Sequence, residues 1–272
     1  MDTYFVLGNP IEQSRSPFIH QQFALQTKQS MQYEKQLVAL ADFQTVINDL
    51  IKNSVKGANV TAPFKEQALA LCTQLSARAK MAGAVNTLSF NNGEIIGDNT
   101  DGIGLVNDLK SQQITLKGKR ILLLGAGGAA RGVILPLLDE EPEQLFIANR
   151  TLAKAELLSE QFINDRISVI SFEQTQDYQF DLIINATSAS LTANVPNISA
   201  DCITNKTVCY DMVYAKQATN FLLWAQSNDA AKVIDGLGML VGQAAESFYQ
   251  WRNVQPDISP VLVKVRKQIN AS

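Results

Sequence analysis

Short hydrophobic runs alternate along this chain with stretches in which hydrophobic residues recur at helical spacing. The short apolar run at residues 4–8 predicts a β-strand, and two further strands are expected at residues 33–40 and 57–60. Residues 43–51 carry Phe, Val, Ile, Leu and Ile at positions three to four apart, which predicts an amphipathic helix. Strand and helix patterns in alternation predict an α/β protein with mainly parallel sheets.

Three local patterns predict where elements begin and turn. Ser16 as an N-cap and Pro17 at the first helical position predict a helix over residues 17–27. Pro63 predicts the start of a second helix, which would place Lys65 one turn inside it. The sequence Asn91-Asn92-Gly93 separates strand patterns at residues 84–90 and 94–98 and predicts a β-hairpin.

The second half of the chain repeats the alternation after a predicted helix at residues 101–109. Strands are expected at residues 121–124, 145–148, 169–170, 181–185, 208–212 and 233–234, and final helices at 240–252 and 260–269. We therefore expect two α/β domains with a deep cleft between them, a common place for a ligand. The expected boundaries are a substrate-binding domain over 1–101, a Rossmann-type domain over 102–236, and C-terminal helices over 237–272 that pack back on the first domain.

A glycine-rich turn follows the strand at residues 121–124. It consists of Gly125-Ala126-Gly127-Gly128-Ala129-Ala130 and leads into a helix pattern, and a second apolar run ends at Ala148. This order matches a G-x-G-x-x-A variant of the dinucleotide-binding fingerprint. In that motif the first glycine forms the tight turn, the second admits a pyrophosphate, and the helix N-terminus supplies free N–H groups.

The end of the second nucleotide strand indicates which dinucleotide binds. An NAD site usually has Asp or Glu there, but this chain has Asn149, Arg150 and Thr151, with Lys154 one helical turn later. A guanidinium can bind the 2′-phosphate of NADP through paired hydrogen bonds, whereas a carboxylate would repel it. The pattern favours NADP(H), the alternative being a solvated arginine at a helix start.

Composition excludes several classes of function. The 272 residues are 46% hydrophobic and 18% charged with a net charge of −3, which does not suit a general nucleic-acid binder. One histidine and three cysteines, Cys72, Cys202 and Cys209, offer no metal-ligand spacing, and we expect reduced cysteines and no metal. The N-terminus lacks the pattern of a signal peptide, and no stretch predicts a membrane span, so a cytoplasmic protein is expected.

Polar residues gather where strands of the first domain are predicted to end. Ser14 and Ser16 can donate to a carboxylate, Lys65 can face the same cleft, and Thr61, Asn86 and Asp101 can bind hydroxyl groups. Each residue alone also has a structural interpretation: Ser16 as a cap, Lys65 as a solvated helix residue, Asp101 as an N-cap. Four such groups together with a nucleotide fold favour the functional interpretation.

These motifs together resemble shikimate dehydrogenase over nearly the whole chain. They are Asn9-Pro-Ile-Glu-Gln-Ser14-Arg-Ser16-Pro, Asn59-Val-Thr-Ala-Pro-Phe-Lys65-Glu, Ala84-Val-Asn86-Thr, Asp98-Asn-Thr-Asp101-Gly, the glycine turn, Asn149-Arg-Thr151 and Asp235-Gly-Leu-Gly-Met239-Leu-Val-Gly-Gln243. The family reduces 3-dehydroshikimate to shikimate with NADPH in aromatic amino-acid and chorismate biosynthesis. The resemblance therefore implies a small-molecule substrate, NADP(H), no nucleic acid or membrane partner, and a monomer or homodimer.

The resemblance also implies a role for individual residues. Lys65 and Asp101 would form the catalytic pair, Lys65 giving the proton while NADPH gives the hydride. The full set of implied substrate residues is Ser14, Ser16, Thr61, Lys65, Asn86, Asp101, Tyr214 and Gln243, and Met212, Gly236 and Met239 would flank the nicotinamide. Two positions depart from the family pattern. Ser190 replaces a glycine, and the turn could be shifted if that glycine has positive φ in the family. Asn220 replaces a proline at a helix start.

Three alternatives remain open at this stage. A quinate/shikimate dehydrogenase using NAD shares the substrate side but conflicts with Arg150. A catalytically silent NADP-responsive binding protein conflicts with the intact Lys65 and Asp101. A methylene-folate-type dehydrogenase has a related two-domain plan but does not need the paired serines.

Overall fold

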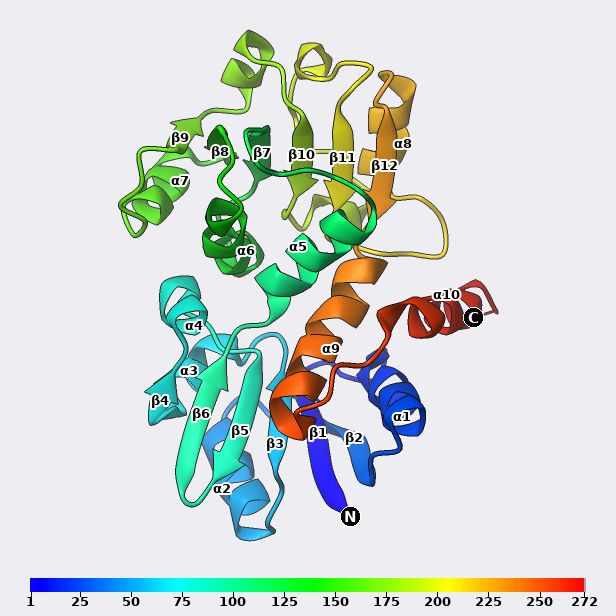
Figure 1. Ribbon diagram of the computed structural model, residues 1–272. Coiled ribbons are helices and arrows are strands. Elements are labelled where there is room, and N and C mark those ends of the chain that lie inside the picture. The colour runs from blue at the N-terminus through cyan, green and yellow to red at the C-terminus, as the bar shows by residue number, and fades with distance from the viewer. Residues whose placement is uncertain (272) are drawn as a thin grey trace. The chain divides into compact units, whose positions relative to one another are not determined.

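The computed structural model of the protein describes residues 1–271. It divides into two compact units, one made of Met1–Gly104 and the residues from Leu240 onward, the other of Leu105–Met239. Both boundaries fall inside helices, α5 (Asp101–Ser111) and α9 (Leu237–Arg252), which carry the chain from one unit to the other (Figure 1). No helix in these residues has the length and apolarity that a membrane crossing requires.

The first unit is built on a six-stranded sheet with the order β2-β1-β3-β5-β6-β4. β1 pairs in parallel with β2 and β3, and the hairpin strands β5 and β6 join antiparallel to β3. The predicted hairpin is confirmed: Asn92 and Gly93 both have positive φ, as a two-residue type I′ turn requires. The strands are β1 (Asp2–Gly8), β2 (Met31–Leu37), β3 (Gly57–Val60), β4 (Gln74–Leu75), β5 (Thr87–Asn91) and β6 (Glu94–Asp98).

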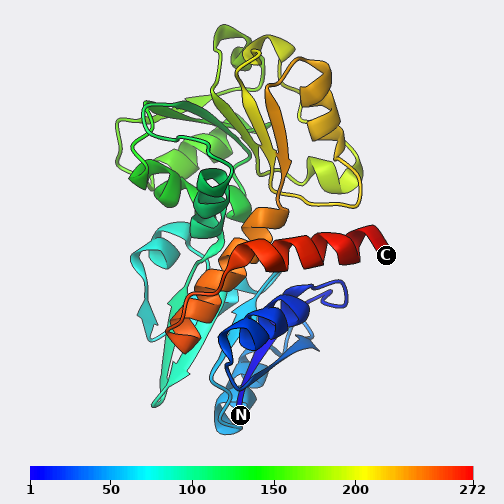
Figure 2. The ribbon, with the colours of Figure 1, turned by 45° about the vertical axis from the view of Figure 1, so that its right-hand side comes forward.

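Helices bury both faces of this sheet. Phe43 of α2 stacks on Phe64 at 4.8 Å between ring centroids within one hydrophobic core, and Tyr4, Phe23, Phe248 and Trp251 form an aromatic cluster elsewhere. In Figure 2, α10 lies beside α1, with which it is in contact. The helices are α1 (Ser16–Thr27), α2 (Phe43–Lys52), α3 (Lys65–Leu71), α4 (Ala77–Ala82), the C-terminal part of α9, and α10 (Ile258–Ala271).

Two predicted helix starts are wrong. Ser16 is the first residue of α1 rather than its N-cap, because the backbone of Arg15 is already helical and the Ser14 hydroxyl accepts the Ser16 N–H at 3.3 Å. The helix after Pro63 begins only at Lys65, because the N–H of Phe64 donates to the carbonyl of Thr61 and closes a turn over Ala62 and Pro63. Lys65 thus lies at the start of α3.

The second unit has a six-stranded, fully parallel sheet with the order β12-β11-β10-β7-β8-β9. Counted from its own first strand this is 6-5-4-1-2-3, the order of the doubly wound dinucleotide-binding fold. The inner strands β7, β8, β10 and β11 are mostly apolar and buried, whereas the edge strands β9 and β12 are largely half-buried. They are β7 (Arg120–Leu124), β8 (Gln144–Ala148), β9 (Ile167–Ile170), β10 (Leu182–Asn185), β11 (Val208–Asp211) and β12 (Lys232–Asp235).

The switch point of this sheet lies between β7 and β10, where the strand order reverses and such folds bind their ligands. The helices of the unit are α6 (Gly128–Asp139), α7 (Leu152–Ser159) and α8 (Asn220–Ser227), with 3₁₀ turns η1 (Glu173–Asp177), η2 (Ala189–Thr192) and η3 (Ala200–Cys202). Cys202 and Cys209 are buried in its core, and none of the three cysteines forms a disulfide in the described part of the chain. Burial raises the pKa of the Cys209 thiol to about 12, so this thiol stays protonated.

Gly57 has no room for a side chain. A Cβ atom there would lie 2.5 Å from the carbonyl oxygen of Leu88 and 2.6 Å from Nε1 of Trp251. Overpacking of this kind costs about 1–3 kcal/mol. We therefore expect Gly57→Ala to lower the free energy of unfolding by that amount in denaturant titrations followed by tryptophan fluorescence. Gly93→Ala is the matched control: the added Cβ meets nothing within 4 Å, and only the positive φ of 84° opposes it, at about 1 kcal/mol. Equal stability of both variants would contradict the packing argument.

Candidate active site

Lys65 and Asp101 form an ion pair in the first unit. Nζ of Lys65, at the start of α3, lies 2.5 Å from Oδ2 of Asp101, the first residue of α5. The two side chains are 31% and 17% exposed, so the pair is sheltered but open to a ligand. The backbone carbonyl of Lys65 accepts the N–H of Val85 at 2.9 Å, which ties α3 to the segment before β5. The predicted catalytic residues are therefore adjacent, and the carboxylate holds the ammonium in place.

Asn86 holds the other oxygen of the Asp101 carboxylate. Its Nδ2 donates to Oδ1 of Asp101 at 2.8 Å and approaches Oε1 of Gln243 at 3.5 Å. Its backbone N–H donates to the carbonyl of Asp98, and its own carbonyl accepts the N–H of Val60. Four predicted site residues, Lys65, Asn86, Asp101 and Gln243, thus meet through hydrogen bonds, and both oxygens of Asp101 are occupied.

The predicted serine pair and Thr61 lie at the ends of β1 and β3. Ser16 is buried and Ser14 is partly buried in the loop that leads into α1. The Thr61 N–H donates to the carbonyl of Leu7, and its Cγ2 packs so closely on Gly8 that a Cβ there would lie 2.5 Å away. Parallel strand ends share one edge of a sheet, so β1 and β3 bring these residues to the same edge. No hydrogen bond among residues 1–271 links the serines to the Lys65–Asp101 pair.

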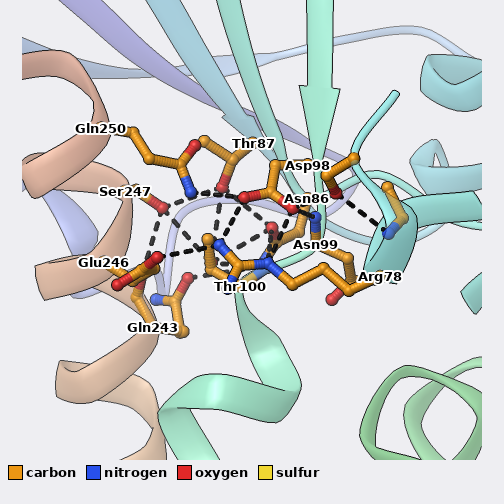
Figure 3. A network of polar contacts seen from close by, with 12 residues as sticks. Arg78, Asn86, Thr87, Asp98, Asn99, Thr100, Gln243, Glu246, Ser247 and Gln250 are labelled. Atoms are coloured by element: carbon orange, nitrogen blue, oxygen red, sulfur yellow. Dashed lines mark hydrogen bonds and ion pairs between the residues drawn. The ribbon is translucent and has the colours of Figure 1, made fainter. Parts of the chain in front are cut away.

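An ion cluster that the sequence did not reveal fixes the end of β6 (Figure 3). Arg78 binds both oxygens of Asp98, at 2.8 Å from Nε and 2.5 Å from Nη2, and also binds Glu246 at 2.8 Å. Ser76 and Gln250 donate to the same carboxylate. Since Asp98 ends the strand that leads to Asp101, the cluster fixes the approach of the chain to the site. These partners come from α4, β6 and α9. Local sequence patterns do not predict pairs between residues so far apart in the chain.

The cluster also sets the ionisation of Asp98. Desolvation alone would raise the pKa of this carboxyl, but the hydrogen bonds and charge of Arg78 and the Ser76 hydroxyl outweigh it and hold the pKa below its ordinary value of 3.8. The cluster therefore favours the ionised form of Asp98.

The glycine turn has the form expected of a phosphate-binding loop. Gly125 has φ +111°, and a Cβ there would lie 3.2 Å from the carbonyl oxygen of Ala186, so the first position of the motif requires glycine. Gly127 is the N-cap of α6, and no side chain caps this helix. A Cβ on Gly127 or Gly128 would meet nothing within 4 Å. Gly127, Gly128 and Ala129 are exposed, whereas Ala130 is buried against the sheet. The free N–H groups at the start of α6 thus face open space that suits a diphosphate.

The residues after β8 include two cationic side chains, Arg150 and Lys154, that have no partner in the described part of the chain. Asn149 closes the turn by donating to the carbonyl of Thr151 at 2.8 Å. Arg150, Thr151 and Lys154 are exposed, and no hydrogen bond or ion pair in the described part of the chain engages the Arg150 guanidinium or the Lys154 ammonium. No carboxylate stands at this strand end. The donor set therefore fits a 2′-phosphate better than the free ribose hydroxyls of NAD.

The residues expected beside the nicotinamide follow β11 and β12. Gly236 packs on the backbone of Met212 so tightly that a Cβ would lie 2.1 Å from the Met212 carbonyl oxygen. Met239, in the first turn of α9, is buried, and Tyr214 is half-buried in the loop after β11. Met212 and Gly236 are therefore adjacent, as expected for two walls of one site in the second unit.

Asp211 organises this end of the second sheet, and the sequence analysis missed it. Its buried carboxylate accepts hydrogen bonds from the hydroxyls of Ser190 and Thr219, the amide of Asn185 and the N–H of Val213. Ser190, which departs from the family pattern, lies in η2 and is not among the residues with positive φ.

Asn220 is the other departure from the family pattern. It takes the first position of α8, directly after the N-cap Thr219, whose hydroxyl accepts the N–H of Leu222. A residue at this position needs no backbone hydrogen bond within the helix, which is why proline and asparagine are both compatible with it.

Three family models match successive parts of the chain. The shikimate dehydrogenase substrate binding domain matches residues 6–88, the shikimate / quinate 5-dehydrogenase model matches 108–207, and the shikimate 5′-dehydrogenase C-terminal domain matches 236–262. The chain is 55% identical over 268 residues to the shikimate dehydrogenase (NADP(+)) of Colwellia psychrerythraea, covering 98% of both chains. The chain belongs to the shikimate dehydrogenase family.

Three further similarities extend over nearly the full length of the chain. The shikimate dehydrogenase (NADP(+)) of Photobacterium profundum is 53% identical, with 98% of both chains covered. An Ael1 enzyme from Pseudomonas putida is 41% identical with a TM-score of 0.94, covering 97% of this chain and 98% of that one. The shikimate 5-dehydrogenase of Thermus thermophilus, solved with NADP(H) and shikimate, is 31% identical with a TM-score of 0.88, covering 98% of this chain and 99% of that one.

The acid sensitivity of the fold should depend on Asp98. A carboxyl whose pKa is lowered by folding stabilises the protein above its unfolded pKa, and this contribution is lost as the pH falls through the lower folded pKa. We expect Asp98→Asn to lower the free energy of unfolding at pH 7 by about 1.5–3 kcal/mol per charged hydrogen bond lost, and to flatten its pH dependence below the ordinary carboxyl pKa of 3.8. Denaturant titrations at several pH values measure both effects. Asp49→Asn, a carboxylate 60% exposed in its pair with Lys52, is the control; an Asp98→Asn profile with the wild-type slope would contradict the assignment.

Proposed function

We propose that this chain is an NADP(H)-dependent shikimate dehydrogenase that reversibly reduces 3-dehydroshikimate to shikimate. The observation that carries the proposal is the ion pair of Lys65 and Asp101, with Asn86 on the second carboxylate oxygen. Family membership and the names of the relatives, which are shikimate dehydrogenases of the NADP(+) type, support the same activity. Within this proposal the first unit binds the substrate and the second binds NADP(H).

The substrate has a carboxylate, ring hydroxyls and one reacting carbonyl, and the site offers a group for each. We assign the carboxylate to the hydroxyls of Ser14 and Ser16, which lie in the loop at the N-terminus of α1. The ring hydroxyls go to Thr61, Asn86, Asp101 and Gln243, and Tyr214 contributes from the second unit. These assignments rest on the hydrogen-bonding capacity of each side chain and on its place at a strand or helix end.

The chemistry needs a hydride on the carbonyl carbon and a proton on its oxygen. Bound NADPH would supply the hydride. The Lys65 ammonium has three N–H donors, of which Asp101 occupies one, so another can bind the carbonyl oxygen, stabilise the developing alkoxide and transfer the proton. In the oxidation direction the same nitrogen accepts the proton from the substrate hydroxyl. Asp101 orients Lys65 throughout and keeps its second oxygen on Asn86.

The cofactor assignment follows from the open glycine turn and the unpaired Arg150. We assign the diphosphate to Gly125–Ala130 and the start of α6, and the 2′-phosphate to Arg150, with Asn149, Thr151 and Lys154 around it. Met212, Gly236 and Met239 line the nicotinamide position. We further propose a cytoplasmic location, supported by three unpaired cysteines, and a monomer or homodimer.

Replacing Lys65 should remove catalysis and leave cofactor binding intact. A positioned acid–base group contributes roughly 10²–10⁴ to the rate, so Lys65→Ala should lower kcat by that factor with an unchanged Kd for NADP(H). Absorbance at 340 nm with shikimate or quinate, each with NADP or NAD, measures the activity, and we expect shikimate with NADP to be turned over best. Lys56→Ala is the matched lysine control. Turnover of quinate with NAD above shikimate with NADP, or near-normal kcat in Lys65→Ala, would overturn the proposal.

Replacing Arg150 should weaken the binding of NADP but not that of NAD. Charge-assisted hydrogen bonds contribute about 1.5–3 kcal/mol each, so Arg150→Ala should weaken NADP binding roughly ten- to a hundredfold or more. NAD lacks the 2′-phosphate, and its Kd should stay near the wild-type value. Titrations of both nucleotides test this, with Lys206→Ala as a control for the loss of one positive charge in the same unit. A loss of equal size for NADP and NAD would show that Arg150 does not bind the phosphate.

A further inference from the structure

A chain of buried hydroxyl and amide groups runs through the first unit to Asn86. Thr87, Thr100 and Ser247 are fully buried and Asn59 nearly so, and none of them is among the residues assigned to substrate or cofactor. Figure 3 shows Thr87, Thr100 and Ser247 around Asn86; they come from the start of β5, the segment between β6 and α5, and α9. A buried polar group without a hydrogen bond costs about 1–3 kcal/mol, so a cluster of this kind persists only where every member is satisfied.

The donors and acceptors of this chain can be placed in one consistent order. The Tyr33 hydroxyl donates to Oδ1 of Asn59 at 2.7 Å, which leaves the Asn59 Nδ2 group to donate. Nδ2 of Asn59 reaches the Asn86 carbonyl at 3.1 Å and the Ser247 hydroxyl at 3.0 Å. The Ser247 and Thr87 hydroxyls lie 2.8 Å apart, and Thr87 donates to Oδ1 of Asn86 at 2.8 Å. Because Thr87 donates to Asn86, the order assigns the single Ser247 proton to Thr87 rather than to the carbonyl of Gln243, which lies 3.1 Å away. In this order each group donates to the next, and the last acceptor is the amide oxygen of Asn86.

This order fixes which way the Asn86 amide faces. Its Oδ1 also accepts the backbone N–H of Thr100 at 2.9 Å, a group that can only donate. With Oδ1 held by two donors, Nδ2 must face Asp101, to which it donates at 2.8 Å. A flipped amide would place Oδ1 against the Asp101 carboxylate and Nδ2 against the Thr100 N–H, and both contacts would be repulsive. The Thr100 N–H and the Thr87 hydroxyl therefore both favour the orientation in which Asn86 donates to Asp101.

We propose that Thr87 and Ser247 are positioning residues for the reaction: they fix the Asn86 amide so that it holds the Asp101 carboxylate in the orientation that Lys65 requires. The inference rests on the proposed function. It assigns a catalytic consequence to side chains that neither touch the reacting groups nor face solvent, because they act through Asn86. Asn59 and Tyr33 support the same chain from its far end.

Thr87→Val removes the hydroxyl and keeps the shape of the side chain, whereas Thr87→Ser keeps the hydroxyl. We expect Thr87→Val to lower kcat about 10-fold or more, with a change in the KM for shikimate of less than about threefold and an unaltered Kd for NADP(H), and Thr87→Ser to restore kcat. Ser247→Ala should lower kcat in the same direction, and it serves as the test if Thr87→Val does not fold. Thr207→Val, which removes another fully buried threonine hydroxyl in the second unit, is the matched control and should leave kcat unchanged.

A double-mutant cycle separates positioning from a general loss of structure. If Thr87 acts through Asn86 and Asp101, Thr87→Val should reduce kcat in the wild type but hardly at all in the Asp101→Asn background. Equal factors in both backgrounds, or a wild-type kcat in both Thr87→Val and Ser247→Ala, would overturn the inference. The wild-type enzyme tests the proposed function separately. If the wild type does not oxidise shikimate with NADP, the proposed function is wrong. If the wild type is fully active and the variants are unaffected, only the role of Thr87 and Ser247 is contradicted.

Discussion

The geometry of the Lys65–Asp101 pair depends on the need of one buried residue, Asn86, to have its polar groups paired. Its backbone bonds to β3 and to the end of β6, and its side chain bonds to Thr87, Thr100 and Asp101. Because these partners come from separate strands and helices, satisfying the amide fixes the position of each of them. The Lys65–Asp101 pair takes its geometry from this constraint. In the proposed reaction, a carboxylate that is held before substrate arrives need not be reorganised.

In the second unit a buried carboxylate, that of Asp211, has the part that the Asn86 amide has in the first. Asp211 ends β11 fully buried and accepts hydrogen bonds from Ser190, Thr219, Asn185 and Val213. The segments after β10 and β11 are thereby tied to the sheet at the edge where the cofactor is expected. In both units, a buried carboxylate or amide at a strand end forms hydrogen bonds with several neighbouring segments. These bonds fix the loops at the proposed site relative to the sheet.

Local patterns in the sequence predicted most strands, the hairpin and the glycine turn, because these follow from hydrophobic periodicity and from backbone preferences of a few residues. The start of α3 at Lys65 was missed since a turn closed by Phe64 and Thr61 overrides the preference of Pro63. The family resemblance named Lys65, Asn86, Asp101 and Gln243, which the structure brings together. It could not name Thr87 or Arg78, whose partners Ser247 and Glu246 are more than 150 residues away in sequence. The spacing of Ser247 four residues after Gln243, on the same face of α9, was a signal that could have been used.

The two halves of the proposed site differ in how their polar groups are satisfied, and the difference follows from what each must do. Lys65 and Asp101 are sheltered and paired with each other, because a catalytic proton donor must be held in one geometry. The side chains of Arg150 and Lys154 are exposed and have no protein partner among residues 1–271, and Gly127, Gly128 and Ala129 at the start of α6 are exposed as well, so water can solvate these groups until a phosphate takes its place. A charge that is solvated when free and paired when bound adds binding energy without destabilising the fold. In the proposed site, the groups assigned to proton transfer are thus paired within the protein, whereas the groups assigned to the phosphates are left to solvent.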